Sequence, residues 1–127
     1  MEDNVSSPPQ VTCLSAVTLA TQDLDRAVAF YITLGFDLVK NNAALGFATF
    51  RAGQQHLNIT AEHPERAMHW WGRAIFYVAD VDAMYAHAVR SGFTPEFQPR
   101  DAAWGERYFH LKDPDGHEIS FAHPLTT

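Results

Sequence analysis

The chain has 127 residues, of which 46% are hydrophobic and 19% are charged, and its formal net charge is −6 with seven histidines counted as neutral. This length fits one domain of about 100–150 residues, and the 16 Phe, Trp and Tyr residues exclude a disordered acidic tail. The excess of 15 acidic over nine basic residues disfavours nucleic acids and anionic membrane surfaces as partners.

In chain order, the first predicted element is a strand at 17–19, followed by Asp23, a residue type that caps helix N-termini. Apolar residues then recur at helical spacing, and Gly35 marks the expected helix end. The apolar positions of this helix are Leu24, Ala27, Val28, Tyr31 and Ile32. Three more strands are predicted at 36–40, 45–51 and 55–60.

The second half repeats this order. A strand at 75–78 leads to a helix that begins after Asp80 and ends before Gly92. Strands are predicted at 93–97, 107–112 and 118–121, and a type I turn at 113–116 (DPDG) joins the last two.

An internal duplication explains this order. Asp23, Asp25, Ala29, Gly35 and Phe36 reappear 57 positions later as Asp80, Asp82, Ala86, Gly92 and Phe93. The sequence therefore predicts a single α+β domain over 11–124, made of two βαβββ modules. Module 1 covers about 11–60 and module 2 about 73–124, with a linker at 61–72 and a disordered tail at 1–10.

The cellular compartment is predicted from absent signals. The N-terminal residues lack the basic segment and apolar stretch of a secretory signal, and no apolar run approaches the ~18 residues of a membrane helix. Cys13 is the single cysteine, which excludes a disulfide within the chain, and we expect it to be a buried small hydrophobe. A cytoplasmic location is expected.

The paired modules, the first helix DLDRAVAFYITLGF and the closing segment WGERYFHLKDPDGHEISF resemble the vicinal oxygen chelate superfamily over about 14–124. That superfamily includes glyoxalase I, extradiol dioxygenases, fosfomycin-resistance enzymes and bleomycin-resistance proteins. The resemblance implies two curved mixed sheets around a cleft, with the helices outside, and a homodimer.

Metal-dependent members of the superfamily hold one divalent ion with His, Gln or Glu side chains from four strands. The resemblance maps these positions onto Ala16, Arg73, Ser120 and Asn58, with His56 as the alternative register for Asn58. Alanine has no lone pair, arginine is permanently cationic, and serine and asparagine are weak donors for such metals. No metal and no cofactor are therefore expected, although His56 could still converge with His110 and Glu118 as an unorthodox metal site.

The remaining histidines and two of the tryptophans are assigned structural roles. Loop or surface positions are expected for His63, His69, His87 and His123, and a rim position for His117. Trp70 and Trp71 lie in the linker, which favours packing between the modules or in a dimer interface.

The candidate ligand site lies mainly in module 2. Trp104-Gly105 resembles a Trp-Gly pair beside the drug groove of bleomycin-resistance proteins, and strand alternation puts Tyr108 and His110 on one face. Arg73 could bind an anion, stack on a ligand or pair with Glu118, and the internal pair is favoured. The candidate ligand-binding residues are Trp104, Gly105, Tyr108, His110, His56, Asn58, Arg73, Ser120 and Glu118.

The resemblance and the missing ligands together predict a metal-independent, bleomycin-resistance-like binding protein. It would sequester an aromatic, cationic natural product or antibiotic, and no catalytic residue is assigned. The alternative is an enzyme of the same superfamily, of lyase, isomerase or dioxygenase type, which uses non-standard metal ligands or metal-free acid–base residues. A third alternative is a dimeric interaction module with a vestigial cleft.

Overall fold

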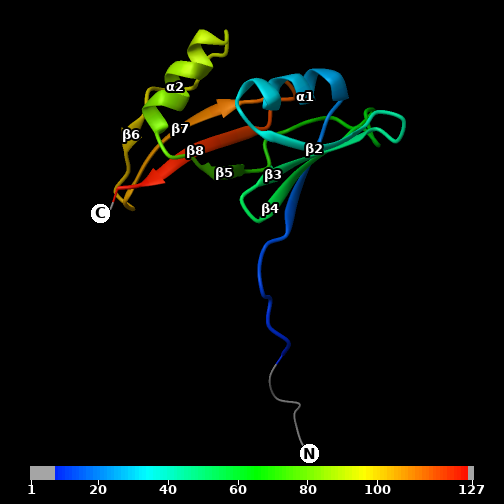
Figure 1. The fold of residues 1–127 in the computed structure, drawn as a ribbon, viewed down its shortest axis with the longest axis horizontal. Coiled ribbons are helices and arrows are strands. Elements are labelled where there is room, and N and C mark those ends of the chain that lie inside the picture. Colours follow the sequence, from blue (N-terminus) through cyan, green and yellow to red (C-terminus); the bar gives the residue numbers. More distant parts are fainter. Residues whose placement is uncertain (1–7, 126–127) are drawn as a thin grey trace, which may run out of the picture.

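The computed structural model describes residues 8–125, which form two four-stranded mixed sheets and two helices (Figure 1). The first sheet has the order β1-β4-β3-β2 and the second β5-β8-β7-β6. The elements of the first half are β1 (Ala16–Ala20), α1 (Leu24–Thr33), β2 (Asp37–Asn42), β3 (Phe47–Ala52) and β4 (Gln55–Thr60). Those of the second half are β5 (Arg73–Tyr77), α2 (Val81–Arg90), β6 (Arg100–Asp101), β7 (Glu106–Lys112) and β8 (Glu118–Pro124).

The two halves share one topology, as the duplication predicts. β1 pairs in parallel with β4, β5 pairs in parallel with β8, and the other strand pairs are antiparallel. The sheets lie side by side with both helices on the same side of them (Figure 1). The predicted α+β fold is confirmed, and neither helix in the described residues has the length and apolar character needed to cross a membrane.

Both helices begin where the sequence predicts. The carboxylates of Asp23 and Asp80 accept hydrogen bonds from the backbone N–H groups of Arg26 and Ala83, at 3.1 and 3.0 Å. Such caps stabilise a helix because its first N–H groups have no partner inside the helix.

The predicted strand at 93–97 is wrong, because the fourth strand of the second sheet is the two-residue β6. Pro95 and Pro99 lack the N–H donors that a continuous ladder requires, so this segment cannot pair along its length. It instead forms a loop that is attached to β7 by one backbone bond, from Glu96 N to His110 O at 2.9 Å.

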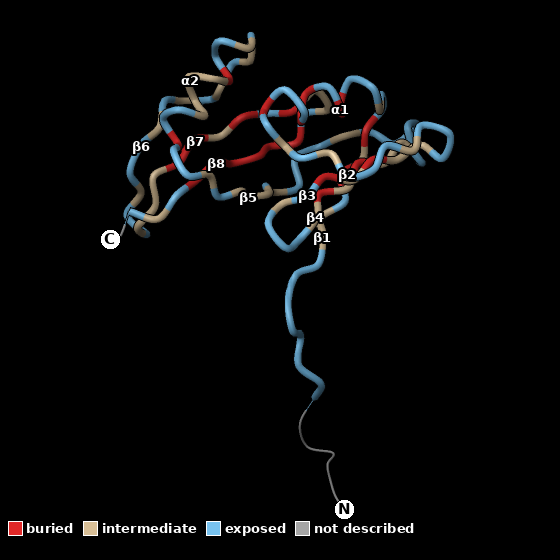
Figure 2. The backbone as a smooth tube through the Cα atoms, viewed as in Figure 1, coloured by how far each residue is buried: buried red, intermediate tan, exposed pale blue. Residues whose placement is uncertain are grey.

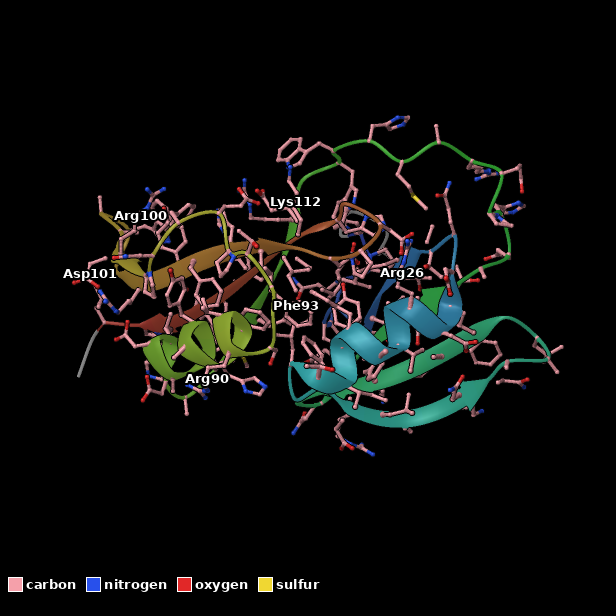
Figure 3. The ribbon with its side chains drawn as sticks, turned by 90° about the horizontal axis from the view of Figure 1, so that it is seen from above. Arg26, Arg90, Phe93, Arg100, Asp101 and Lys112 are labelled. Atoms are coloured by element: carbon pink, nitrogen blue, oxygen red, sulfur yellow. The ribbon has the colours of Figure 1, made fainter. Side chains whose placement is uncertain are left out.

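One apolar core runs between the helices and both sheets, and Figure 2 shows it as buried strand segments beneath the helices. Phe30 and Phe93 pack with ring centroids 4.7 Å apart, and Phe36 and Phe76 with centroids 4.9 Å apart. These two contacts join residues of the two halves, and Phe93 lies between the helices in Figure 3. Alternate strand residues therefore face the helices, and the residues between them face away.

The turn at 113–116 is also a contact between the halves. Asp115 accepts hydrogen bonds from Thr21 Oγ1 (2.6 Å), the backbone N–H of Gln22 (3.0 Å) and Arg26 Nη2 (3.1 Å). Tyr31 donates its hydroxyl to Asp113 at 2.8 Å, and burial raises the pKa of both Tyr31 and Asp113. The turn thus fixes β8 against the start of α1.

Two structural expectations about single residues are wrong. His117 is buried rather than at the rim, because Nε2 lies 2.7 Å from Ala20 O and Trp71 Nε1 donates to Nδ1 at 2.7 Å. Cys13 is exposed rather than buried, because it lies in the extended segment before β1, which leads away from the sheets (Figure 1). Of the expected tail at 1–10, residues 1–7 lie outside the described residues.

The four histidines expected in loops or at the surface are exposed or partly exposed. They are His63, His69, His87 and His123. His87 also links the helices, because its Nε2 lies 2.7 Å from Thr33 O.

Candidate ligand-binding site

The second sheet presents most of the candidate residues on the face away from the helices. Tyr108 and His110 alternate along β7 with Phe109 and Leu111, which are buried in the core. Across the sheet, His110 pairs with Ser120 and Arg73 pairs with Glu118.

Four rings on this face are in contact with one another in a row, which we call the aromatic wall: Phe97, Trp104, Tyr108 and His110. Neighbouring ring centroids are 5.2 Å apart for Trp104 and Tyr108, 5.1 Å for Tyr108 and His110, and 5.1 Å for Phe97 and His110. Trp104 is 68% exposed, so most of its indole is free to contact a ligand. Gly105, beside it, has φ +97°, a conformation that favours glycine and turns the chain from Trp104 into β7.

Arg100 closes one end of the aromatic wall. Its guanidinium carbon lies 3.7 Å from the centroid of the Phe97 ring, and its Nε donates to the Tyr108 hydroxyl at 3.1 Å. Figure 3 shows Arg100 at the outer end of the second half, away from Phe93. The sequence analysis missed Phe97 and Arg100, because it predicted a strand at 93–97. A strand at this place would not have brought these two side chains over β7. Pro95, inside the predicted strand, was the signal against it.

Glu106 lies at the base of the exposed indole. Trp104 Nε1 donates to Glu106 Oε1 at 3.0 Å, and the Tyr77 hydroxyl donates to Glu106 Oε2. This hydrogen bond raises the pKa of the Tyr77 phenol. A carboxylate therefore lies between two exposed aromatic side chains.

Arg73 and Glu118 form the internal ion pair that the sequence favoured. Arg73 Nε and Nη2 both lie 2.7 Å from Glu118 Oε1, and Trp70 Nε1 donates to the same oxygen at 3.2 Å. The Glu118 side chain is 7% exposed and that of Arg73 is 37% exposed. Trp70 therefore connects the linker to this pair, as Trp71 connects it to His117.

The charge state of this face follows from these contacts. Burial by itself raises the pKa of Glu118, but hydrogen bonds from Glu96, Arg73 and Trp70 lower it to about 2. Burial and the bond to Glu118 raise the pKa of Glu96, a residue that the sequence analysis missed. Burial, and then the positive charge of Arg73, lower the pKa of His110, and its buried Nδ1 has no partner among the described residues.

In the part of the chain that the structure describes, Asn58, Ser120 and His56 are not hydrogen-bonded to the aromatic wall side chains or to the Arg73–Glu118 pair. Asn58 accepts a hydrogen bond from Thr49 Oγ1 at 2.8 Å and donates to Thr18 Oγ1 at 3.3 Å, all within the first sheet. Ser120 donates its hydroxyl to Phe109 O at 3.3 Å. His56 lies on β4, opposite Ala16 of β1.

The side chains at the four expected metal positions do not fit a divalent ion. Ala16 offers no donor atom, Arg73 brings a fixed positive charge, and the polar atoms of Asn58 and Ser120 are hydrogen-bonded to other groups. Within residues 8–125, no three His, Cys, Asp or Glu side chains lie close enough to share a metal ion. The alternative set that includes His56 is therefore not brought together.

A cavity of about 650 Å³ lies where the two sheets meet. It is lined by residues of β1, of the β3–β4 turn and β4, and of β5, including His56 and Arg73. It does not include the aromatic wall, so the structure divides the candidate residues between two places.

Comparisons with known proteins identify relatives of this arrangement. A family model described as the Glyoxalase/Bleomycin resistance protein/Dioxygenase superfamily matches residues 14–121. Uncharacterized proteins of Mycobacterium bovis and Mycobacterium tuberculosis are 40% identical over 48 residues. That match spans 38% of this chain but only 32% and 28% of the mycobacterial proteins.

Three solved structures have closely similar folds. Lactoylglutathione lyase from Agrobacterium tumefaciens is 22% identical with a TM-score of 0.74, over 91% of this chain and 95% of that chain. A bleomycin resistance determinant encoded on the transposon Tn5 is 23% identical with a TM-score of 0.73, over 91% and 100%. A bleomycin-binding protein in complex with bleomycin is 25% identical with a TM-score of 0.69, over 89% and 98%.

Proposed function

The chain belongs to the Glyoxalase/Bleomycin resistance protein/Dioxygenase superfamily, and we propose that within it the chain is a metal-independent binding protein for an aromatic, cationic natural product or antibiotic. The observation that carries this proposal is the aromatic wall, whose four rings are in contact and whose Trp104 is largely exposed. A bleomycin-binding protein has the same fold, although this fold also hosts a lyase.

The wall has the geometry for stacking a flat ring. Trp104 offers an exposed π surface that is backed by the buried ring of Tyr108, and aromatic side chains lose little conformational entropy when a ligand stacks on them. Glu106 lies beside Trp104 and can accept hydrogen bonds from a cationic group of the same ligand. The net charge of −6 favours the approach of such a ligand over that of an anion.

A bleomycin titration tests the proposal. Tryptophan fluorescence should be quenched on binding, and Trp104→Ala should weaken the affinity measured by calorimetry at least about tenfold, since base-like rings stacked on aromatics contribute about 1–3 kcal/mol. Trp71→Phe is the matched control, because Trp71 contacts His117 rather than the wall, and its affinity should be unchanged. Absence of binding across several bleomycin-type drugs would contradict the proposal.

Metal independence has its own test. The protein, purified without chelators, should contain well under one equivalent of any divalent metal per chain by elemental analysis. A ratio near one metal per chain would contradict this part of the proposal, whatever the drug titration shows.

A homodimer and a cytoplasmic location belong to the same proposal. β1 and β5 are each at an edge of their sheet, and association with a second chain would cover such edges. Analytical ultracentrifugation should therefore give twice the mass of the 14.2 kDa chain. A monomer at micromolar concentration would contradict the dimer.

The second candidate is an enzyme of the superfamily that acts on a small metabolite by acid–base chemistry. One observation favours it: the pKa values of Glu96 and Glu118 are shifted in opposite directions by their mutual interaction, and Glu118 also affects the pKa of His110. Two neighbouring carboxyl groups whose pKa values are shifted apart are suited to the separate roles of proton donor and proton acceptor. Product formed from a candidate ligand, and lost in Glu118→Gln, would support this function over simple binding.

A further inference from the structure

The segment 61–72, which connects β4 to β5, has attachments that neither the core nor the aromatic wall explains. We call this segment the strap, and Figure 3 shows it as a loop that arches beyond the sheets. Among the described residues, no backbone–backbone hydrogen bond joins residues 62–72 to the rest of the chain. Side chains hold the strap instead, through Gln22 at its middle and through Trp70 and Trp71 near its end.

The bond from Trp71 is the shortest of these attachments. Gln22 Nε2 donates to two carbonyl oxygens of the strap at 3.3 and 3.5 Å, whereas Trp71 Nε1 lies 2.7 Å from Nδ1 of the buried His117. Gly72, directly after Trp71, has φ +117°, and outside its chain neighbours no atom lies within 4 Å of where its Cβ would be. The chain therefore has room to turn at Gly72, and the position of this end of the strap depends on His117.

The two partners of the His117 ring determine where its proton lies. The carbonyl oxygen of Ala20, 2.7 Å from Nε2, can only accept a hydrogen bond, so Nε2 carries the proton. The indole N–H of Trp71 can only donate, so Nδ1 must offer a lone pair. Both bonds are therefore made together only by the neutral imidazole in its Nε2–H tautomer.

We propose that His117 is a proton-sensitive latch for the strap. Neutral His117 holds Trp71 and keeps the strap closed. A proton taken from solvent by Nδ1 opens the strap, because two N–H groups would then face each other across 2.7 Å. The bond to Ala20 is kept, since Nε2 still donates and the positive charge strengthens it. The proposal goes beyond the function proposed above and does not depend on it, because no ligand takes part in the opening.

The charged groups around His117 are compatible with its protonation. The elements that surround the ring carry Asp113 and Asp115 in the turn, Tyr31 and Arg26 in α1, Glu118 in β8 and Arg73 in β5. The charged and titratable groups of the strap itself lie between 62 and 69 and are exposed. Asp115 and Glu118 are each paired with an arginine, whereas Asp113 accepts the backbone N–H of His117 at 2.9 Å. The Asp113 carboxylate therefore attracts a positive charge on this ring.

Opening of the strap reaches the second sheet through Trp70. This residue precedes Trp71 and donates to Glu118 at 3.2 Å, beside the bonds from Arg73. Consecutive Cα atoms are about 3.8 Å apart, so a displaced Trp71 pulls Trp70 away from the carboxylate. The open strap thus uncovers the Arg73–Glu118 pair in response to acidity. Among the described side chains, no hydrogen bond or ring contact joins the strap to the aromatic wall, which keeps its closed-state geometry.

NMR of the full chain with ¹⁵N-labelled tryptophan and histidine tests the latch. At about pH 8, His117 should show a protonated Nε2 and an unprotonated Nδ1, and both nitrogens should be protonated at about pH 5. Over the same range, the indole N–H signal of Trp71 should move upfield with the midpoint of the His117 ring, and the signal of Trp70 should follow. An Nδ1–H tautomer at the high pH, or a Trp71 signal that does not follow the His117 titration, would overturn the proposal.

The exposed histidines of the strap supply matched controls. His63→Gln and His69→Gln should leave the titration of the Trp71 signal unchanged, because neither side chain contacts the indole N–H. His117→Gln should abolish this titration, because a glutamine side chain does not change its charge. Circular dichroism verifies that each variant is folded. A Trp71 signal that still titrates in His117→Gln, or that stops titrating in either control, would overturn the proposal.

Trp71→Phe tests the coupling while His117 is kept, so it decides the question even if His117→Gln does not fold. Phenylalanine keeps an apolar ring but cannot donate a hydrogen bond, so the strap should be open at every pH. The Trp70 indole signal should then lie, already at high pH, where the wild type places it at low pH. A Trp70 signal that stays at its wild-type high-pH position would show that Trp71 does not hold the strap and would overturn the proposal.

Discussion

The two sheets differ most on the faces that point away from the helices. On the first sheet, Asn58 is hydrogen-bonded to both Thr18 and Thr49, so the middle of this face is polar and internally hydrogen-bonded. On the second sheet, the rings of Trp104 and Tyr108 are in contact beside charged groups, and part of this surface is exposed. The duplicated fold has thus kept one scaffold in both halves, and the binding face that we propose lies in one of them.

The faces that point toward the helices are alike by comparison. Phe50 and Leu57 on the first sheet, and Phe109 and Ile119 on the second, are fully buried in one core. The core requires only apolar side chains at alternate strand positions, so both copies of the module keep that pattern. The opposite face has no such requirement, and it is free to differ between the copies.

Core truncations should have the largest effect on stability and should not distinguish the halves. Phe50→Ala and Phe109→Ala should each lower the free energy of unfolding by about 3–5 kcal/mol, because both remove a fully buried ring. Urea denaturation measures this loss. A loss below about 1 kcal/mol in one half alone would show that the core is not shared.

Loss of the buried carboxylate should have an intermediate effect, confined to the second half. Glu118→Gln should cost about 1–2 kcal/mol at pH 7, less than a fully buried pair would, because the Arg73 side chain is 37% exposed. Asn58→Ala, the control on the first sheet, should cost less than about 1 kcal/mol. Equal losses in the two variants, measured by thermal unfolding, would contradict the electrostatic difference between the faces.

The Glu118 contribution should also depend on pH. The pKa of Glu118 is lowered from 4.5 to about 2 in the folded protein, so its stabilisation is present above about pH 4.5 and is lost as the pH falls toward 2. The raised pKa of Glu96 has the opposite sign, and its contribution is present at low pH and lost as the pH rises through that pKa. Denaturant midpoints at pH 6, 4 and 3 should fall less steeply in Glu118→Gln than in the wild type.

His110 should titrate below an ordinary histidine, which is a smaller effect. Burial and the charge of Arg73 lower its pKa from 6.5, so the neutral ring is favoured in the folded state. Its contribution to stability is therefore present above pH 6.5 and is lost as the pH falls from 6.5 toward the lowered folded pKa. The imidazole carbon-bound proton signals in an NMR titration should give a midpoint below 6.5, and a midpoint above 6.5 would reverse the assigned charge state.

The smallest effect on stability is expected at the most exposed apolar side chains. Trp104→Ala in the second half and Leu45→Ala in the first should each change the free energy of unfolding by less than about 0.5 kcal/mol, because both side chains are largely exposed. Chemical denaturation of the two variants checks this. A large loss in Trp104→Ala would mean that the indole stabilises the fold and that any change in drug binding is indirect.

Local sequence patterns predicted the scaffold well. The caps at Asp23 and Asp80 and the alternation of Tyr108 with Phe109 depend on neighbouring residues alone, and the structure confirms them. The ion pair of Arg73 with Glu118 was predicted from the rule that a buried arginine needs a partner, and the pair forms although its buried member is Glu118 and Arg73 is 37% exposed.

The misses depend on contacts between distant segments. His117 is buried because the turn at 113–116 docks on α1, and no local pattern encodes that contact. Glu96, Phe97 and Arg100 belong to the candidate site because a proline-containing loop folds back over β7. Periodicity describes strands and helices, but it does not predict where such a loop returns.

Mapping of bound bleomycin by backbone amide NMR tests the central claim most directly. The account predicts that saturating drug shifts or broadens the amide signals of residues 96–110, around the aromatic wall, and leaves those of β3 and β4 unchanged. Perturbations centred on β3 and β4, or divided equally between the two sheets, would contradict the claim that the second half alone carries the binding face.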